Sequence, residues 1–324
     1  MKAVLCTHFG TADELEFADI APPLAAAGEA VVRVKAAALN FFDTLIIAGK
    51  YQHKPPFPFS PAAEFAGVVE SVGPGVSEVV PGDRVMSFLG WGAAREAIAV
   101  PARQLVRLPP ELDFDRAAGL CITYGTSLYA LRERARIAAG ETLAVLGAAG
   151  GVGLASVELG RLLGARVIAC ASSEEKLAFT RAHGAHATIN YAAENLREAL
   201  KRLGGEHGID VVYDPIGGPY AEPAVRSLAW QGRYLVVGFT TGEIPKLPLN
   251  LVLLKGCDIR GVFWGSWSNR EPQARQALLS DVARWAAEGK LSGHIHAVYP
   301  LAQIAAAMKL FSDRTVMGKI VLRP

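Results

Sequence analysis

The sequence contains little cysteine, and its cysteines stand far apart along the chain. Only four are present, and none belongs to a CxxC pair of the kind that holds a metal ion or forms a redox-active disulfide. This excludes a cysteine-clamped metal and predicts four reduced, buried thiols, at Cys6, Cys121, Cys170 and Cys257.

Blocks of like charge and long apolar runs are lacking as well. The net charge is +2 with basic and acidic residues interspersed, so electrostatics gives no reason to expect nucleic acid or a membrane surface as a partner. No apolar stretch reaches the roughly 18 residues needed to span a bilayer. The first residues, MKAVLCTHFG, lack the apolar core and cleavage site of a signal peptide. We therefore expect a soluble, cytoplasmic protein.

What is present is enough apolar material for two cores. Hydrophobic residues make up 51% of the 324 residues, and this length exceeds that of a usual single domain. The first 115 residues or so are predicted to be β-rich, because short apolar runs at residues 30–38, 65–72 and 84–88 are separated by Gly and Pro. From about residue 142 to residue 239, strand-like runs alternate with helix-like runs. That rhythm predicts an α/β fold with a parallel sheet covered on both faces.

The alternating region predicts a definite series of elements. Strands are expected at residues 142–146, 166–171, 188–190, 210–214 and 233–239, and helices at residues 151–163, 174–183, 194–203 and 220–230. Beyond this region we expect a sixth strand at residues 258–264, helices near residues 273–288 and 302–311, and a last strand at residues 319–322.

A glycine-rich turn lies between the first of these strands and the first helix. Glycine lets the backbone approach a pyrophosphate closely, and the helix that follows offers unpaired N–H groups and a favourable dipole. The strand before it and the helix after it distinguish this pattern from an ordinary Gly-rich turn. The turn therefore predicts a dinucleotide site with contacts from Gly147, Ala149, Gly150, Gly151, Val152 and Gly153.

The end of the second strand indicates which dinucleotide is bound. An acidic residue there would pair with the ribose 2′-hydroxyl of NAD(H), but the position is taken by Ala171. The hydroxyls of Ser172 and Ser173 and the ammonium of Lys176 are suited to a 2′-phosphate instead. We therefore expect NADP(H), although Lys176 also fits a plain solvated position on a helix.

The glycine turn is one of several stretches that match a known family of enzymes. The stretches are residues 38–43 (ALNFFD), 64–73 (EFAGVVESVG), 81–85 (PGDRV), 124–127 (YGTS), 147–153, 214–218 (DPIGG) and 318–321 (GKIV). With these stretches, and over essentially its whole length, the chain resembles the medium-chain dehydrogenase/reductase superfamily, and specifically its zinc-independent, zeta-crystallin-like quinone oxidoreductase branch.

This resemblance implies a domain arrangement. A GroES-like catalytic domain is formed by residues 1–115 and 256–324, a Rossmann domain by residues 116–255 is inserted between them, and the active site lies in the cleft between the two. Family members commonly form homodimers by joining Rossmann sheets edge to edge. The strand expected at residues 258–264 would be the edge strand that does so.

The resemblance also implies that no zinc is bound. Zinc-dependent relatives have a cysteine at the position of Asn40 and a Gly-His-Glu motif at the position of Ala62, Ala63 and Glu64, so two ligands are missing. A catalytic zinc needs about three protein ligands, and Glu64 cannot hold one alone. Cys121 lies near the region of the third ligand, but a solitary thiol is better explained as part of the core.

Without a Lewis acid a saturated alcohol is a poor substrate, because its oxidation needs help in developing an alkoxide. Quinones and α,β-unsaturated carbonyls are better suited, since conjugation spreads the charge that hydride addition creates and hydrogen-bond donors can suffice. The sequence therefore predicts an NADPH-dependent reductase that transfers hydride to a quinone.

Three residues of one N-terminal segment border the nicotinamide pocket by family resemblance. Asn40 could donate its amide to the substrate oxygen or to the coenzyme, and Asp43 would orient its neighbours. Tyr51 matches the tyrosine that related enoyl-thioester reductases use as a proton donor. A strand-end turn at Asn40 and Asp43 and a half-buried aromatic at Tyr51 are the alternatives.

Further coenzyme contacts follow from the same resemblance. They are Thr126, Tyr191 at the adenine, Gly218, and the residues framing the nicotinamide and the acceptor, Phe239, Thr240 and Phe263. Trp264 fits that frame or the core equally well.

Two other functions remain open at this point. One is a 2-enoyl thioester or enone reductase on the same scaffold, ranked second because no basic cluster suits the phosphates of coenzyme A. The other is an NADPH-binding structural or stress protein whose chemistry is incidental.

Overall fold

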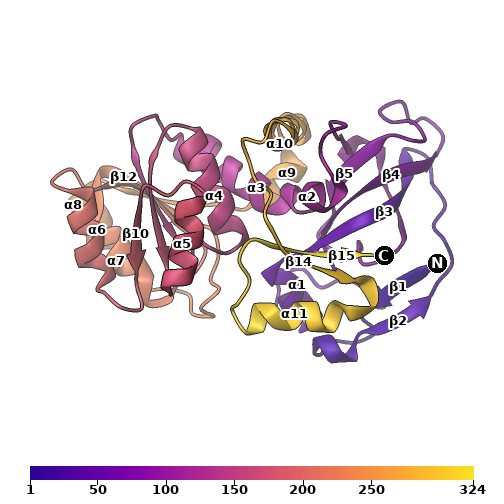
Figure 1. Ribbon diagram of the computed structural model, residues 1–324, viewed down its shortest axis with the longest axis horizontal. Coiled ribbons are helices and arrows are strands. Elements are labelled where there is room, and N and C mark those ends of the chain that lie inside the picture. The colour runs from indigo at the N-terminus through magenta and orange to yellow at the C-terminus, as the bar shows by residue number, and fades with distance from the viewer. The chain divides into compact units, whose positions relative to one another are not determined.

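The computed structural model describes all residues from Met1 to Pro324, and the chain forms two compact units. The first unit comprises residues 1–122 and 268–324, and the second comprises residues 123–267. Each unit is built on a large sheet of its own (Figure 1). None of the helices combines the length and apolar character that crossing a bilayer requires.

The sheet of the first unit is completed by the end of the chain. Its order is β14-β15-β3-β4-β5-β7, and β6 also pairs with β3. The last strand, β15, runs antiparallel to β3, with Ile320 opposite Leu39. The strands are β3 (Glu29–Leu39), β4 (Glu64–Val72), β5 (Arg84–Phe88), β6 (Ala97–Pro101), β7 (Val106–Arg107), β14 (Ile295–Pro300) and β15 (Lys319–Arg323). A separate two-stranded sheet pairs β1 (Lys2–Leu5) with β2 (Glu16–Asp19).

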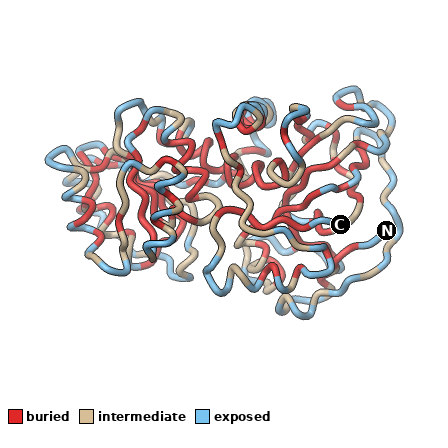
Figure 2. Tube along the Cα trace, in the orientation of Figure 1, coloured by how far each residue is buried: buried red, intermediate tan, exposed pale blue.

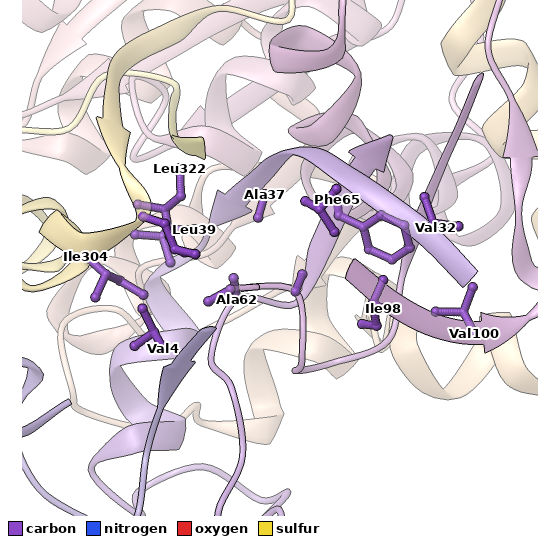
Figure 3. Packing of buried hydrophobic residues seen from close by; sticks show 14 of the residues in the cluster. Val4, Val32, Ala37, Leu39, Ala62, Phe65, Ile98, Val100, Ile304 and Leu322 are labelled. Atoms are coloured by element: carbon purple, nitrogen blue, oxygen red, sulfur yellow. The ribbon is translucent and has the colours of Figure 1, made fainter. Parts of the chain in front are cut away.

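One apolar cluster joins this sheet to the segments packed on it. Figure 3 shows Leu39 and Leu322 from the sheet near Ile304 from helix α11 (Ile304–Ser312), with Phe65 and Val32 farther along the same cluster. Phe65 is completely buried, and burying a side chain of this size contributes about 1.5–3 kcal/mol. The cluster therefore ties the C-terminal helix to the N-terminal strands. The other helices of this unit are α1 (Phe41–Ile47), α2 (Phe114–Ala118) and α10 (Pro272–Ala287).

The sheet of the second unit is parallel throughout. Its order is β10-β9-β8-β11-β12-β13, which places the reversal of strand order between β8 and β11, where this class of sheet binds its ligands. The strands are β8 (Thr142–Leu146), β9 (Arg166–Ala171), β10 (Ala187–Asn190), β11 (Ile209–Asp214), β12 (Leu228–Val236) and β13 (Asp258–Gly261). Their buried runs appear as the red centre of this unit in Figure 2.

Helices cover both faces of that sheet, as the alternating pattern predicts. Figure 1 shows α4 (Gly151–Leu162) and α5 (Glu174–Ala182) on one face. On the other face lie α6 (Leu196–Gly204), α7 (Ala221–Arg226) and α8 (Leu249–Lys255), which pack on the sheet through one apolar cluster. The remaining helices are α3 (Leu120–Leu128), which crosses from the first unit into the second, α9 (Trp264–Arg270) and a π-helical segment at Tyr129–Ala135.

Three expected elements differ from the structure. The helix expected at residues 220–230 ends at Arg226, because strand β12 begins two residues later, at Leu228. Gln231 lies where the register of β12 shifts against β11, and its backbone has a left-handed φ of 60°. The strand expected at residues 233–239 accordingly starts earlier and ends at Val236. The strand expected at residues 258–264 ends at Gly261, and Trp264 opens a helix instead. Five further helices, α1, α2, α3, α8 and α9, were not predicted, since each has nine residues or fewer and is too short for a clear periodic pattern.

Candidate functional site

The register of the first unit's sheet brings three distant polar residues together. Ile320 pairs with Leu39 in the antiparallel β15–β3 ladder, so Lys319 lies opposite Asn40. Ala38 pairs with Glu64 across the β3–β4 ladder, which adds the carboxylate. All three side chains are buried. Because buried polar groups are stable only with partners, their hydrogen bonds define the site.

Lys319 is the centre of this cluster. Its Nζ atom lies 2.7 Å from Glu64 Oε1, 2.7 Å from Asn40 Oδ1 and 2.8 Å from the Leu39 carbonyl oxygen. Asn40 Nδ2 donates to Glu64 Oε1 at 3.0 Å. The three donors of an ammonium are thus used, and one of the two N–H bonds of the Asn40 amide is taken by Glu64.

Glu64 has no free oxygen in this arrangement. Its other oxygen, Oε2, accepts the backbone N–H of Ile122 at 2.8 Å. The neighbouring Cys121 is fully buried, and burial raises the pKa of its thiol, with the Glu64 carboxylate adding to the rise. Cys121 is therefore a protonated core thiol, and all four cysteines are buried and unbridged.

The side chains at this place do not fit a zinc ion. Asn40 and Ala63 offer no ligand of the type that zinc takes in proteins, and no group of three or more His, Cys, Asp or Glu side chains is positioned to share a metal. Glu64 is the one residue of these three whose side chain could bind zinc, and its carboxylate already forms an ion pair with the Lys319 ammonium. Ala62, where the zinc relatives have glycine, holds a left-handed φ of 62°. The turn is thus kept, and its methyl group lies in the apolar cluster (Figure 3).

Asp43 lies next to the cluster at the start of helix α1. Asn40 is the N-terminal cap of that helix, and its backbone N–H donates to Asp43 Oδ2 at 2.7 Å. The other oxygen, Oδ1, is buried without a partner. Burial raises the pKa of Asp43 to about 7, against the opposing effects of the Asn40 N–H and the Lys319 charge. Asp43 can therefore change its charge near neutral pH.

Tyr51 follows helix α1 and is half-buried. Its ring stacks on that of Phe42, with centroids 5.3 Å apart and planes 22° apart. Burial raises the pKa of the Tyr51 hydroxyl, and the nearby Asp43 raises it further. The phenol therefore keeps its proton at neutral pH and has one available to donate.

The glycine turn of the second unit has the geometry of a phosphate cradle. Gly147 has a left-handed φ of 59°, and a Cβ atom on Gly153 would lie 2.2 Å from the Gly147 carbonyl oxygen. Gly150 is the N-terminal cap of α4. The Leu154 N–H donates to the Gly150 carbonyl oxygen and makes the first hydrogen bond of the helix. The N–H groups before it, from Gly151 to Gly153, have no such partner within the helix. They suit the oxygens of a pyrophosphate.

Helix α3 is hydrogen-bonded to the start of α4, next to this turn. Ser127 Oγ donates to the Val152 carbonyl oxygen at 2.9 Å and is hydrogen-bonded to the Tyr213 hydroxyl, also at 2.9 Å. These bonds connect α3, α4 and β11. Thr126, the residue before Ser127, is buried, and its contact with a coenzyme stays a prediction.

The end of β9 presents the residues expected at a 2′-phosphate. Ser173 caps helix α5, and its Oγ accepts the backbone N–H of Lys176 at 3.3 Å, while Ser172 is exposed. The Tyr191 N–H donates to the Ala171 carbonyl oxygen at 3.1 Å, which fixes the tyrosine beside this strand end. Its ring lies 4.7 Å from that of Tyr220, a neighbour that the sequence did not indicate.

Two loops at the ends of β11 and β12 are bonded to each other. Gly218 donates its N–H to the Glu243 carbonyl oxygen at 3.1 Å, and Thr240 donates to Pro215 at 3.2 Å. Phe239 packs on Gly217, whose Cβ would lie 2.8 Å from the Phe239 ring. Phe239 and Phe263 are 37% and 47% exposed, whereas Trp264 is 4% exposed and lies against Gly125. Trp264 therefore belongs to the core.

The structure thus places Asn40 and Asp43 beside Lys319 and Glu64 in the first unit. The residues predicted to contact the coenzyme all belong to the second unit, and their contacts with it stay a prediction. Lys319 was not singled out from the sequence. The sequence feature that could have indicated it is a lysine at the start of a strand, followed by three apolar residues. The structure shows that these three residues are buried. A lysine in such a strand is almost never fully buried without a partner.

Comparison with known protein families gives two matches. A model described as "Alcohol dehydrogenase GroES-like domain" matches residues 26–110, and one described as "Zinc-binding dehydrogenase" matches residues 151–280. Together they span parts of both units.

Individual relatives agree over nearly the whole chain. Quinone oxidoreductase-like protein 2 of Rattus norvegicus is 35% identical and covers 99% of this chain and 91% of its own length. Quinone oxidoreductase of Homo sapiens is 32% identical, with 99% and 97% covered. The crystal structure of the Escherichia coli quinone oxidoreductase complexed with NADPH matches with a TM-score of 0.92 and 27% identity over 100% of both chains.

Proposed function

The chain belongs to the quinone oxidoreductase branch of the medium-chain dehydrogenase/reductase superfamily and is an oxidoreductase, and we propose that it reduces a quinone with NADPH and without zinc. The observation that carries the proposal is the buried Lys319, Glu64 and Asn40 cluster, which leaves no zinc ligand set at the position where the zinc relatives have one. An acceptor that needs no Lewis acid is the one consistent with it.

The roles proposed for this chain's residues follow from their contacts. When bound, the reduced coenzyme supplies a hydride, and one proton from the medium or from an acid completes the hydroquinone. The N–H groups at the start of α4 hold the pyrophosphate, Ser172, Ser173 and Lys176 hold the 2′-phosphate, and Asn40 donates to the acceptor oxygen. Tyr51 keeps a proton on its hydroxyl for donation.

We also propose a homodimer formed through β13. This strand is an edge of the parallel sheet, so one side of its backbone has no partner strand. Helix α8, which precedes it, exposes Leu249, Leu253 and Leu254 by 70–79%, and a group of exposed leucines on one short helix is typical of a protein contact surface.

Changing Tyr51 to Phe tests the proposed acceptor. An enone must be protonated at carbon, whereas the oxygen of a reduced quinone takes a proton from water. We expect turnover of 9,10-phenanthrenequinone and 1,4-benzoquinone to survive in Tyr51→Phe and turnover of crotonyl-CoA, if wild type shows any, to fall by about 100-fold, a typical general-acid contribution. The measurement is kcat/KM for the three acceptors with NADPH. If the wild-type protein turned over crotonyl-CoA far better than either quinone, the proposed function would be wrong and the protein would be an enoyl-thioester reductase instead.

The coenzyme preference is tested at the end of β9. A charge-assisted hydrogen bond contributes about 1.5–3 kcal/mol, so NADPH should be preferred to NADH by at least about 10-fold. Lys176→Ala should erode that preference by weakening NADPH alone, since only the phosphate differs between the coenzymes. Ala171→Asp should reverse it by repelling the phosphate and pairing with the free ribose hydroxyls.

The measurement is kcat/KM with both coenzymes, and Lys201→Ala, which removes an exposed lysine of helix α6, is the matched control. Equal losses for NADPH and NADH in Lys176→Ala would contradict the assignment of this strand end to the phosphate.

A further inference from the structure

The Lys319 ammonium lies among the side chains that occupy the metal-ligand positions of the zinc-dependent relatives. Asn40 stands at one such position, Glu64 follows the other, and Nζ is 2.7 Å from an oxygen of each. The Lys319 side chain is 4% exposed and the Glu64 side chain is fully buried, so water does not screen the pair. A buried protein cation therefore contacts the residue at one ligand position and the residue that follows the other.

This cation determines how the Asn40 amide can be oriented. An ammonium only donates, so the atom of Asn40 that faces it must be the carbonyl oxygen. A carboxylate only accepts, so the atom facing Glu64 must be the amide nitrogen. The two contacts, 2.7 Å from Lys319 Nζ to Oδ1 and 3.0 Å from Nδ2 to Glu64 Oε1, select one of the two amide orientations. Flipping the amide would set donor against donor and acceptor against acceptor.

One N–H bond of Asn40 remains after these contacts. Asn40 is 7% exposed, so nearly all of the residue is enclosed. Oδ1 accepts from Lys319 and one N–H bond points to Glu64, which leaves the second N–H of Nδ2 as the side-chain group that could donate to a ligand. A donor held in one direction suits an oxygen that gains negative charge.

We propose that Lys319 is a positioning residue which replaces the catalytic metal indirectly, by holding Asn40 as a hydrogen-bond donor toward the carbonyl oxygen of a conjugated acceptor. The proposal rests on the proposed function in naming the acceptor. Lys319 itself touches no ligand, because its three donors are used by Leu39, Asn40 and Glu64.

The kinetic test compares Lys319→Met, Asn40→Leu and the double variant. Removing one donor to a developing oxyanion costs about 100-fold or more, so each single variant should lose about 100-fold in kcat/KM for 9,10-phenanthrenequinone. The loss should fall on the acceptor, with the KM for NADPH unchanged. Because Lys319 acts through Asn40, the double variant should lose no more than either single one, whereas independent roles would multiply the losses.

Lys319→Met also leaves a buried carboxylate without its cation, and its melting temperature should fall. A second variant, Lys319→Met combined with Glu64→Gln, removes both charges and should recover much of that temperature while turnover stays about 100-fold low. Lys290→Met is the matched control, because Lys290 makes a 2.7 Å ion pair with Glu288 at the surface and should change neither property. If the variant that combines Lys319→Met with Glu64→Gln recovered turnover as well as stability, Lys319 would have only a structural role and the proposal would be overturned.

A readout without turnover separates this proposal from the proposed function. In ¹⁵N-labelled protein the Asn40 side-chain amide, assigned by its loss in Asn40→Leu, should show one exchange-protected proton directed at Glu64. We expect that protection to disappear in Lys319→Met. If wild type reduced no quinone but protection depended on Lys319, the acceptor would be wrong and the orientation of Asn40 right. Protection unchanged in Lys319→Met would overturn the orientation itself.

Discussion

Replacing Gly153 by alanine is expected to weaken NADPH binding by at least about 100-fold and to lower the free energy of unfolding by about 2–3 kcal/mol. The new Cβ would lie 2.2 Å from the Gly147 carbonyl oxygen and 2.8 Å from the Ala148 Cα atom. Both are backbone atoms, so no side chain can turn away and the turn itself must move. The N–H groups that we assign to the pyrophosphate would move with it.

Gly150→Ala separates binding from folding at the same turn. A Cβ on Gly150 would have its nearest neighbour, the Gly147 carbonyl oxygen, at an ordinary 3.6 Å, so stability should be unchanged. NADPH affinity should still fall, because the methyl group blocks the close approach of a pyrophosphate to the helix start.

Gly150→Ala also serves as the stability control for Gly153→Ala, since both add one methyl group to the same turn and only the one on Gly153 would meet backbone atoms closer than 3 Å. Affinity is measured by titration of coenzyme fluorescence and stability by urea unfolding. A Gly153→Ala protein with wild-type NADPH affinity would contradict the assignment of this turn.

Asp43 is expected to make the protein less stable as the pH rises from about 4 to about 7. Its pKa is 3.8 in the unfolded chain and about 7 in the folded protein, because burial disfavours the charged carboxylate. In that window the folded state binds more protons than the unfolded state, so the free energy of unfolding falls with pH. Each pKa unit is worth about 1.4 kcal/mol, so the contribution changes by about 4 kcal/mol across the window and is constant above it.

Asp43→Asn isolates this contribution, because an amide has the shape of the protonated carboxyl and does not titrate. Its Oδ1 can still accept the Asn40 N–H. The stability of Asp43→Asn minus that of wild type should therefore grow by about 2 kcal/mol between pH 5 and pH 7, measured by urea unfolding at each pH. The same substitution at the exposed Asp13 is the control for losing a carboxylate in general. A difference that did not vary with pH would show that Asp43 is charged throughout.

Much of the second unit could be predicted from the residues because its signals are local. Strands β8 and β9 have the bounds expected from their apolar runs, and the glycine turn lies between a strand and a helix as its spacing requires. The helix expected at residues 220–230 was wrong because Gln231 forms part of a bulge in β12, and a bulge depends on the neighbouring strand β11. Local propensity contains no information about that pairing.

Residues close together in the chain are enough to specify an α/β protein with a glycine turn at the head of a parallel sheet, since each of these features depends on residues within a few positions of one another. The surroundings of Asn40 depend instead on how distant parts of the chain pack together. Lys319 is 279 positions away and Glu64 is 24, and strand register alone makes them neighbours. A strand shifted by one residue would turn its side chains to the opposite face of the sheet, so the cluster exists only because packing of the apolar core fixes that register.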